Sequence, residues 1–268
     1  MKHYLKLYLK LFKITFRKQT MYRTTYFAGI VGQWLGYGAT FITILILVNS
    51  FDSLDGWKGA EVMLLYGISV LSYAIGAAFF FTPCIELSSK LRSGEFDIAL
   101  TKPIHPFLHE MFGGFNMGYV SHFTISLIII IFSLRTLGHQ LTMVHIAWLI
   151  LMILGASLLQ AAALIASSVL SFFTISNNPL VDFLLFDIKK FTNYPITIFP
   201  RGIQLILTFV LPFAFINYYP AAMLFNKPIP VGYPSVLPYL TPIVGIIFFI
   251  GSIILWNWGL KHYKSTGS

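Results

Sequence analysis

The chain has 268 residues, of which 57% are hydrophobic and only 10% are charged. Its mean hydropathy of +0.77 is far above that of an ordinary soluble domain. No polar stretch is long enough to build such a domain, so we expect a single membrane domain over residues 1–268. The formal net charge of +9 does not require a nucleic-acid partner, because basic residues in multi-pass proteins usually mark the cytoplasmic loops.

The N-terminal segment, residues 1–23, predicts an amphipathic helix. Its basic residues are spaced by four, four, three and four positions and so share one stripe of a helix: Lys2, Lys6, Lys10, Lys13 and Arg17. Leucine and aromatic residues cover the remaining surface. We expect this helix to lie in the cytoplasmic interface of the lipid bilayer. The alternative, a cleavable signal peptide, lacks a small-residue cleavage site after the first span.

Six stretches without Asp, Glu, Lys or Arg follow, and each can hold the ~20 apolar residues that cross a bilayer as a helix. They are 24–51, 62–85, 111–134, 136–181, 202–226 and 228–260. The fourth contains one long segment, near Met143 to Phe172, between two polar hinges. The expected fold is therefore all-α, with six transmembrane helices.

The distribution of Lys and Arg predicts the orientation of these helices. Fifteen of the eighteen Lys and Arg residues lie in the segments 1–23, 83–107, 173–201 and 261–268. The other three lie in the alternate loops, on the opposite side of the membrane. Because cytoplasmic loops retain basic residues, both termini are expected in the cytoplasm.

The first span contains the sequence GIVGQWLGYG, in which Gly29, Gly32 and Gly36 leave backbone bare for close helix contact. These glycines are candidates for a subunit interface. Packing within the subunit explains them equally well.

A charged segment, residues 84–106, separates the second and third spans. The chain has eighteen basic and nine acidic residues, and six of these charged residues lie between Glu86 and Lys102. Both signs of charge occur there, among apolar residues, and Pro103 and Pro106 are expected to stop its helix. Such a loop can dock into a groove of another protein, although solvated cytoplasmic loops also carry charges routinely.

The segment 174–200 is expected to be cytoplasmic or interfacial, with a short helix near 179–190. A span is expected from about Arg201, followed by a turn or re-entrant piece near Asn217 to Pro220, because prolines punctuate this region. An ordinary bent helix is the alternative.

Few patterns indicate chemistry. No GxxxxGK(S/T) nucleotide-binding loop occurs, and the interiors of the spans lack carboxylates. His105, His109 and Glu110 could suggest a metal site, but Pro106 interrupts them and no third ligand is evident. Cys84 is the single cysteine, which excludes an intrachain disulfide. We therefore expect no metal, no bound cofactor and no catalytic activity in this chain.

Three pieces of the sequence resemble the six-span permease subunits of type 2 ATP-binding-cassette (ABC) transporters, in the branch without a large extracellular domain. They are LRSGEFDIALTKP, FTNYPITIFPRGIQLILTFVLPFAFINYYPA and WNWGLKHYKSTG. With the amphipathic start and the six spans, the likeness covers nearly the whole chain.

The resemblance implies a place in a bacterial cell membrane, a second permease, identical or homologous, and two copies of a separate ATPase that binds ATP and Mg²⁺. It also implies that the loop after the second span is a coupling helix that sits in a groove of the ATPase. By position, six residues of this sequence are the coupling candidates: Glu86, Lys90, Arg92, Gly94, Glu95 and Asp97. The amphipathic start would be the elbow helix.

The sequence thus favours a membrane-spanning permease subunit of an ATP-driven export system. The alternative is a self-sufficient secondary transporter or channel, whose charged segment is only a solvated loop.

Overall fold

The computed structural model describes residues 13, 17, 23–50, 53–138, 142–174 and 188–264. These residues form helices joined by turns, and no strand occurs among them. The all-α fold class is therefore confirmed. The predicted amphipathic helix of residues 1–23 lies outside the described part of the chain, apart from residues 13, 17 and 23. Residues 175–187 of the predicted 174–200 segment also lie outside it.

Five long helices dominate the fold: α2 (Arg23–Asn49), α3 (Gly59–Ser93), α6 (Val120–Leu137), α7 (Met143–Ser168) and α12 (Thr241–His262). Shorter α-helices connect them: α4 (Glu95–Leu100), α5 (Pro106–Gly113), α9 (Ile188–Phe191), α10 (Arg201–Leu205) and α11 (Ala214–Leu224). Single turns complete the order: the 3₁₀ turns η1 (Met117–Tyr119), η2 (Val169–Phe172), η4 (Ile196–Ile198) and η6 (Leu237–Tyr239), and the π-helical η5 (Ile206–Val210).

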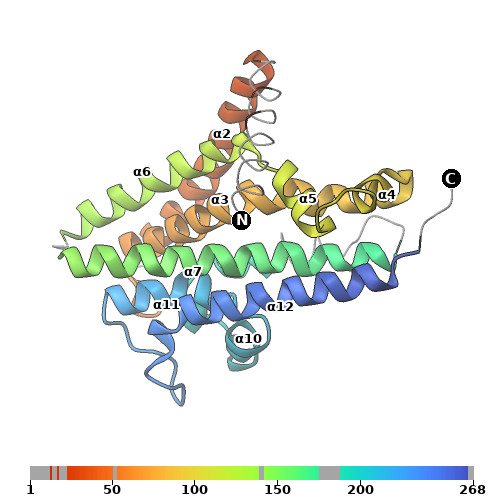
Figure 1. The fold of residues 1–268 in the computed structure, drawn as a ribbon. Coiled ribbons are helices and arrows are strands. Elements are labelled where there is room, and N and C mark those ends of the chain that lie inside the picture. Colours follow the sequence, from red (N-terminus) through yellow and green to blue (C-terminus); the bar gives the residue numbers. More distant parts are fainter. Residues whose placement is uncertain are drawn as a thin grey trace.

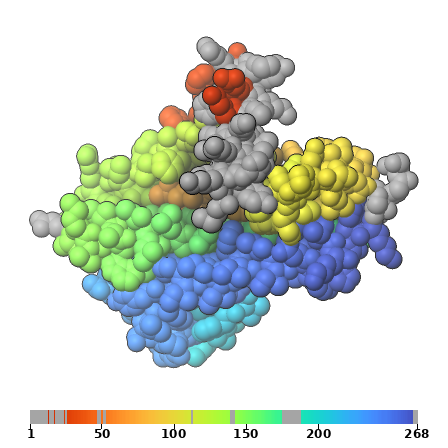
Figure 2. Space-filling model, in the orientation of Figure 1, coloured from red at the N-terminus to blue at the C-terminus, as the bar shows by residue number. Residues whose placement is uncertain are grey.

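The long helices α3, α7 and α12 run side by side in the same direction, and α6 runs back against α3 (Figure 1). In the view of Figure 2, the first part of α7 and much of α12 form the surface of one face. α2 stands away from this layer, and α4 and α5 lie at the end of the molecule where α3 and α12 finish. The charged segment is therefore collected at one end of the bundle.

Among the described residues, five helices are long and apolar enough to cross a membrane, and the number rises to six if a bent pair counts as one span. The fourth predicted span, Met143 to Phe172, coincides with one of them, α7 continued by η2. The bent pair joins Arg201–Val210 to Ala214–Leu224 at an angle of 102°. The structure thus agrees with a multi-pass membrane protein.

α3 is the central helix, with most of its length buried. Its 35 residues extend over about 52 Å at 1.5 Å per residue, whereas the hydrocarbon core of a bilayer is about 30 Å thick. The helix is therefore long enough to project beyond the lipid. The predicted cytoplasmic segment begins at residue 84, but the helix continues to Ser93.

Glycines allow α7 and α12 to touch backbone to backbone. A Cβ atom on Gly155 would lie 2.6 Å from Cα of Pro242, and one on Gly245 would overlap the carbonyl oxygen of Gly155. Between helices in lipid, such close van der Waals packing replaces the hydrophobic effect as the main attraction. The two helices are consequently held at a distance that only glycine permits.

Buried amides join the other helices. Gln160 of α7 donates from Nε2 to Oγ of Ser72 at 2.7 Å and to the carbonyl oxygen of Ser69 at 3.0 Å, both on α3. Asn217 of α11, fully buried, donates to the carbonyl oxygens of Leu65 and Thr192. Each amide satisfies backbone carbonyls or hydroxyls that would be costly to leave unpaired in an apolar interior.

The chain turns at Pro212, between η5 and α11. The predicted position of this turn, Asn217 to Pro220, is wrong, because these residues are buried inside α11. Pro212 has no N–H to continue the preceding helix, whereas the Asn217 side chain is used to anchor α11 to α3. A proline inside a helix and a proline at its break have the same local sequence signal.

The opposite end of α3 is held by an ion pair. Nζ of Lys227 lies 2.7 Å from Oε2 of Glu61, which is buried, and donates to the carbonyl oxygen of Gly56 at 2.8 Å. The Glu61 carboxylate also accepts from the backbone N–H of Lys58 at 2.8 Å. This network closes the α11–α12 connection over the start of α3.

We predict that Gly245→Ala destabilises the protein, because its methyl group would force α12 away from α7. Overpacking of this kind costs about 1–3 kcal/mol, and the thermal midpoint is expected to fall by about 5 °C or more. Gly251→Ala is the matched control, because nothing lies within 4 Å of a Cβ at Gly251 on the same helix. Thermal unfolding in detergent compares the two, and equal midpoints would contradict the packing described.

Candidate functional site

The charged end, residues 86–110, is shaped by one glycine. Gly94 has φ = +73°, a left-handed conformation that other residues rarely adopt. It ends α3 after Ser93 and starts α4 in a new direction. The first turn of α4 carries Glu95 and Asp97, whose charges complement the positive end of a helix. Gly94 therefore sets the direction in which α4 leaves the bundle.

The inner face of α4 is anchored by an aromatic cluster. Phe96 is fully buried, and its ring contacts those of Phe172, Trp256 and Tyr263 edge-on, with centroids 5.8, 6.3 and 5.4 Å away. Phe172 ends the span formed by α7 and η2, and Trp256 lies on α12. Edge-to-face pairs contribute about 0.5–1.5 kcal/mol each beyond their buried area. α4 is thus fixed to the ends of two membrane helices besides α3.

Asp97 reinforces this anchor. Its Oδ1 accepts a hydrogen bond from the hydroxyl of Tyr263 at 3.0 Å, just after the end of α12. Because the carboxylate is partly buried, this bond to a charged acceptor is worth more than a neutral one. Asp97 therefore holds α4 to α12.

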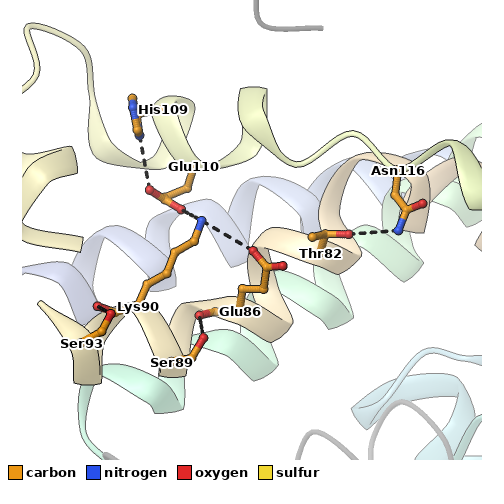
Figure 3. A network of polar contacts seen from close by, with 8 residues as sticks. All are labelled: Thr82, Glu86, Ser89, Lys90, Ser93, His109, Glu110 and Asn116. Atoms are coloured by element: carbon orange, nitrogen blue, oxygen red, sulfur yellow. Dashed lines mark hydrogen bonds and ion pairs between the residues drawn. The ribbon is translucent and has the colours of Figure 1, made fainter. Parts of the chain in front are cut away.

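An ion pair attaches α5 to α3 (Figure 3). Nζ of Lys90 lies 2.8 Å from Oε2 of Glu110, which is buried, and 3.8 Å from Oε2 of the exposed Glu86. The other oxygen of Glu110 lies 3.3 Å from Nδ1 of His109. Breaking a buried pair by removing one partner leaves an uncompensated charge, which costs about 3–5 kcal/mol. Lys90 consequently holds α5 against α3.

The histidines near the Lys90–Glu110 ion pair make structural contacts. Nδ1 of His105 accepts from the backbone N–H of Phe107 at 3.3 Å and caps α5, which begins at Pro106. Pro106 therefore starts a helix, where its missing N–H costs nothing. Within the described part of the chain, no group of three His, Cys, Asp or Glu side chains could hold a metal ion.

The outer face of the charged end combines charge with apolar surface. Glu86, Arg92 and Glu95 are exposed. Beside them on α4, Ile98 and Leu100 are 56% and 44% exposed. A small patch of apolar residues among charges of both signs is typical of a surface that binds another protein.

The six predicted coupling residues therefore divide into three groups. Glu86, Arg92 and Glu95 form the outer face, Lys90 and Asp97 make contacts inside the chain, and Gly94 sets the turn. The sequence did not predict Phe96 as an anchor, because a phenylalanine near a membrane helix end carries no distinctive pattern.

The predicted packing glycines Gly29, Gly32 and Gly36 lie on α2, and nothing lies within 4 Å of a Cβ at any of them. Within the described part of the chain, these three glycines therefore make no close packing contact. Their surroundings on α2 are apolar and exposed, including Phe27, Val31 and Leu35.

Sequence reasoning missed a second polar group at the level of the spans. Lys189 of α9 places its Nζ 3.1 Å from the ring centroid of Tyr73 on α3, and His122 of α6 packs against Tyr37 with ring centroids 4.3 Å apart. A search for Asp, Glu, Lys and Arg inside the spans overlooks His122. Lys189 lies outside the apolar runs in sequence, and only the folded chain brings it to α3.

A family model described as ABC-2 family transporter protein matches residues 35–267. No curated protein and no solved structure is significantly similar to the chain. The matched residues run from the middle of α2 to beyond the end of α12 and include the whole charged end. The chain thus belongs to the ABC-2 family of transporter proteins and is a multi-pass transmembrane permease.

Proposed function

We propose that this chain is the membrane subunit of an ATP-driven exporter, which lines the translocation path together with a second permease and is driven by a separate ATPase. The ATPase, in two copies, binds ATP and Mg²⁺. The observation that carries the proposal is the outer face of the charged end, where Glu95 and Arg92 flank the exposed Ile98 and Leu100. This face is the proposed docking surface for the ATPase.

The contacts of α4 explain how movement of the ATPase reaches the membrane. α4 continues α3 across Gly94, and Phe96 joins it to Phe172 and Trp256. The α5 helix, held by Glu110 to Lys90, leads into α6. A displacement of α4 therefore acts on four membrane helices together, and rigid packing transmits it because a close-packed interior does not deform continuously.

The second permease is proposed to contact α2. No described atom outside the helix's own backbone lies within 4 Å of a Cβ placed at position 29, 32 or 36, and bare backbone suits close contact between helices in lipid. Whether the second permease is identical or homologous does not alter this assignment.

The proposal is tested by purifying the tagged chain from its native membrane in a mild detergent. We expect a nucleotide-hydrolysing subunit to copurify with it. The alternative, a self-sufficient secondary transporter or channel, draws support from His122 inside a span, because intramembrane ionisable residues often mark ion pathways. Flux driven by an ion gradient in liposomes that contain this chain alone would establish the alternative.

We predict that Glu95→Lys abolishes copurification of the ATPase while leaving expression and folding unchanged, since Glu95 is exposed and its reversal alters only the outer face. Like charges placed opposite each other at an interface cost several kcal/mol, so association should weaken at least about a hundredfold. Ser53→Lys, at an exposed position before the start of α3, is the control and should retain the ATPase. Normal copurification with the Glu95→Lys protein would count against the docking surface.

We predict that Tyr263→Phe loosens α4 without displacing its aromatic anchor, because only the hydrogen bond to Asp97 is lost. Such a bond contributes about 1.5–3 kcal/mol when the acceptor is charged. Limited chymotrypsin digestion should cleave after the exposed Leu100, at the end of α4, several-fold faster than in the wild type. Tyr239→Phe is the control, since its partly exposed ring packs on Trp148 and its hydroxyl donates no hydrogen bond to the residues that the structure describes. Equal cleavage rates in both variants would contradict the anchoring role of Asp97.

The proposed orientation places the charged end in the cytoplasm. We predict that a membrane-impermeant maleimide labels Ser53→Cys but not Ser93→Cys in intact cells, and labels both after permeabilisation. Both positions are exposed, Ser53 before the start of α3 and Ser93 as its last residue, and the native Cys84 is buried. Labelling of Ser93→Cys in intact cells would place the charged end outside and exclude an intracellular ATPase as its partner.

A further inference from the structure

A polar cavity of about 340 Å³ lies between α2, α3 and α9. Its wall includes Gln33, Tyr37 and Thr40 from α2, Tyr73 from α3, and Lys189 and Asn193 from the α9 region. Among the residues that the structure describes, no carboxylate belongs to its lining. The charged side chains of this described lining are lysines, and its other polar groups are hydroxyls and amides.

Lys189 lies deep along α3. Its partner ring, Tyr73, is in the charge-free run of α3 between Glu61 and Glu86, which is the part of the helix that crosses the membrane. Next to it, Thr192 and Ser69 of α3 share a hydrogen bond of 3.3 Å. The ammonium group is thus placed at the level of the lipid, at the wall of the cavity.

The position of α9 is fixed by several contacts. Asn217 of α11 donates to the carbonyl oxygens of Thr192 and Leu65 and so ties α9 to α3. Thr192 and Asn217 are both buried. Lys189 consequently reaches the cavity from a constrained backbone.

The Lys189 ammonium lacks an anionic partner within the described part of the chain, where no carboxylate pairs with it. Its contact with the Tyr73 ring contributes about 2 kcal/mol in a dry site. This energy recovers only part of the cost of removing the charge from water. A charge at this depth without a counter-charge is expensive, and it usually marks a substrate or ion pathway. A bound anion would supply the missing charge.

The shape of the surroundings indicates what kind of anion fits. The helix that supplies Gln33 and Tyr37 to the cavity also presents Val31 and Leu35 outward, 56% and 69% exposed. A hydrocarbon tail can lie along this apolar side of α2 in the lipid while a head group enters the cavity. Lysine binds phosphate as a point charge, and neutral hydroxyl and amide donors can complete its coordination.

We propose that this cavity binds the phosphate head group of an anionic amphiphile, which is the cargo class of the transporter. The inference rests on the proposed export function, since only an export permease would pass such a molecule onward. Lys189 provides the charge, Tyr37 and Gln33 provide donors, and α2 borders the route to the lipid. An amphiphile without negative charge leaves Lys189 unpaired and binds more weakly.

The test uses the full chain, purified in a non-ionic detergent and titrated with phosphatidic acid or with phosphatidylcholine of the same acyl chains. Bound lipid is counted by native mass spectrometry. We expect phosphatidic acid to bind about tenfold more tightly or better. Lys189→Gln should remove this preference, and Lys189→Arg should retain most of it. Lys261→Gln, at an exposed lysine on α12, is the control for general attraction of anionic lipid to a basic protein and should keep the preference.

Two further measurements decide the remaining outcomes. Gln33→Leu leaves Lys189 in place and should weaken phosphatidic acid binding by about threefold through the loss of one donor, so the proposal can be tested even if Lys189→Gln misfolds. Inorganic phosphate at millimolar concentration should not displace the lipid. Displacement would show that a free anion is sufficient for binding and would contradict the proposal that the ligand is an amphiphile.

Equal effects of Lys189→Gln and Lys261→Gln, or equal binding of the two lipids, would also overturn the proposal. Lipid binding and copurification of the ATPase are measured separately, so these failures are distinct from failure of the proposed function. Loss of lipid selectivity with a normally copurifying ATPase would refute only the cargo class.

Discussion

The continuity of α3 is the constraint on which the rest of the structure depends. This single helix carries the Glu61 ion pair at one end, the wall of the polar cavity at Tyr73, and the Lys90 ion pair at the other end. About twenty residues, or roughly 30 Å of helix, separate Tyr73 from Ser93. Because a helix is stiff along its axis, the charged end and the cavity cannot move independently. On the proposed mechanism, the surface that receives work from the ATPase and the wall that contacts cargo are two parts of one element.

The buried charges also fall into two kinds, those paired within the chain and one without a described counter-charge. The buried carboxylates Glu61 and Glu110, at the two ends of α3, each have a basic partner within 2.8 Å. Such pairs contribute little net stability compared with apolar residues, but breaking one is strongly destabilising. The pairs therefore fix the orientation of the segments that they join. Lys189 differs from both ion pairs, because its ammonium group lies over the Tyr73 ring and no carboxylate among the described residues pairs with it. The contrast separates charges that hold the fold from a charge that is available to a ligand.

Much of this architecture could be predicted from the sequence, for identifiable reasons. The span Met143 to Phe172 was correct because a long apolar run between polar hinges has few alternatives in a membrane protein. The turn near Asn217 was misplaced because Pro212 and Pro220 are equivalent locally, and the buried hydrogen bonds of Asn217 form only with α3 and Thr192. The coupling role of the six candidates stays a prediction. Glu86, Arg92 and Glu95 are exposed, whereas the contacts of Lys90 and Asp97 depend on Glu110 and Tyr263, which are distant in sequence. Lys189 was counted as a topology signal, and only tertiary contacts bring it to Tyr73.

A proline in α3 lies between its two functional parts, where a kink would uncouple them. Pro83 lies inside the helix between Tyr73 and Lys90, and a proline removes one backbone hydrogen bond and favours a kink. The chain between α5 and α6 braces this point. Gly114 lies so close to the Pro83 ring that a Cβ would overlap it. The backbone N–H of Asn116 donates to the carbonyl oxygen of Ala78 at 2.8 Å. Its Nδ2 donates to Oγ1 of Thr82 at 3.3 Å (Figure 3). These contacts bridge the turn that contains the proline, so bending at Pro83 must also move α5 and the start of α6. The same brace therefore makes α3 and α6 respond together to any displacement of the charged end.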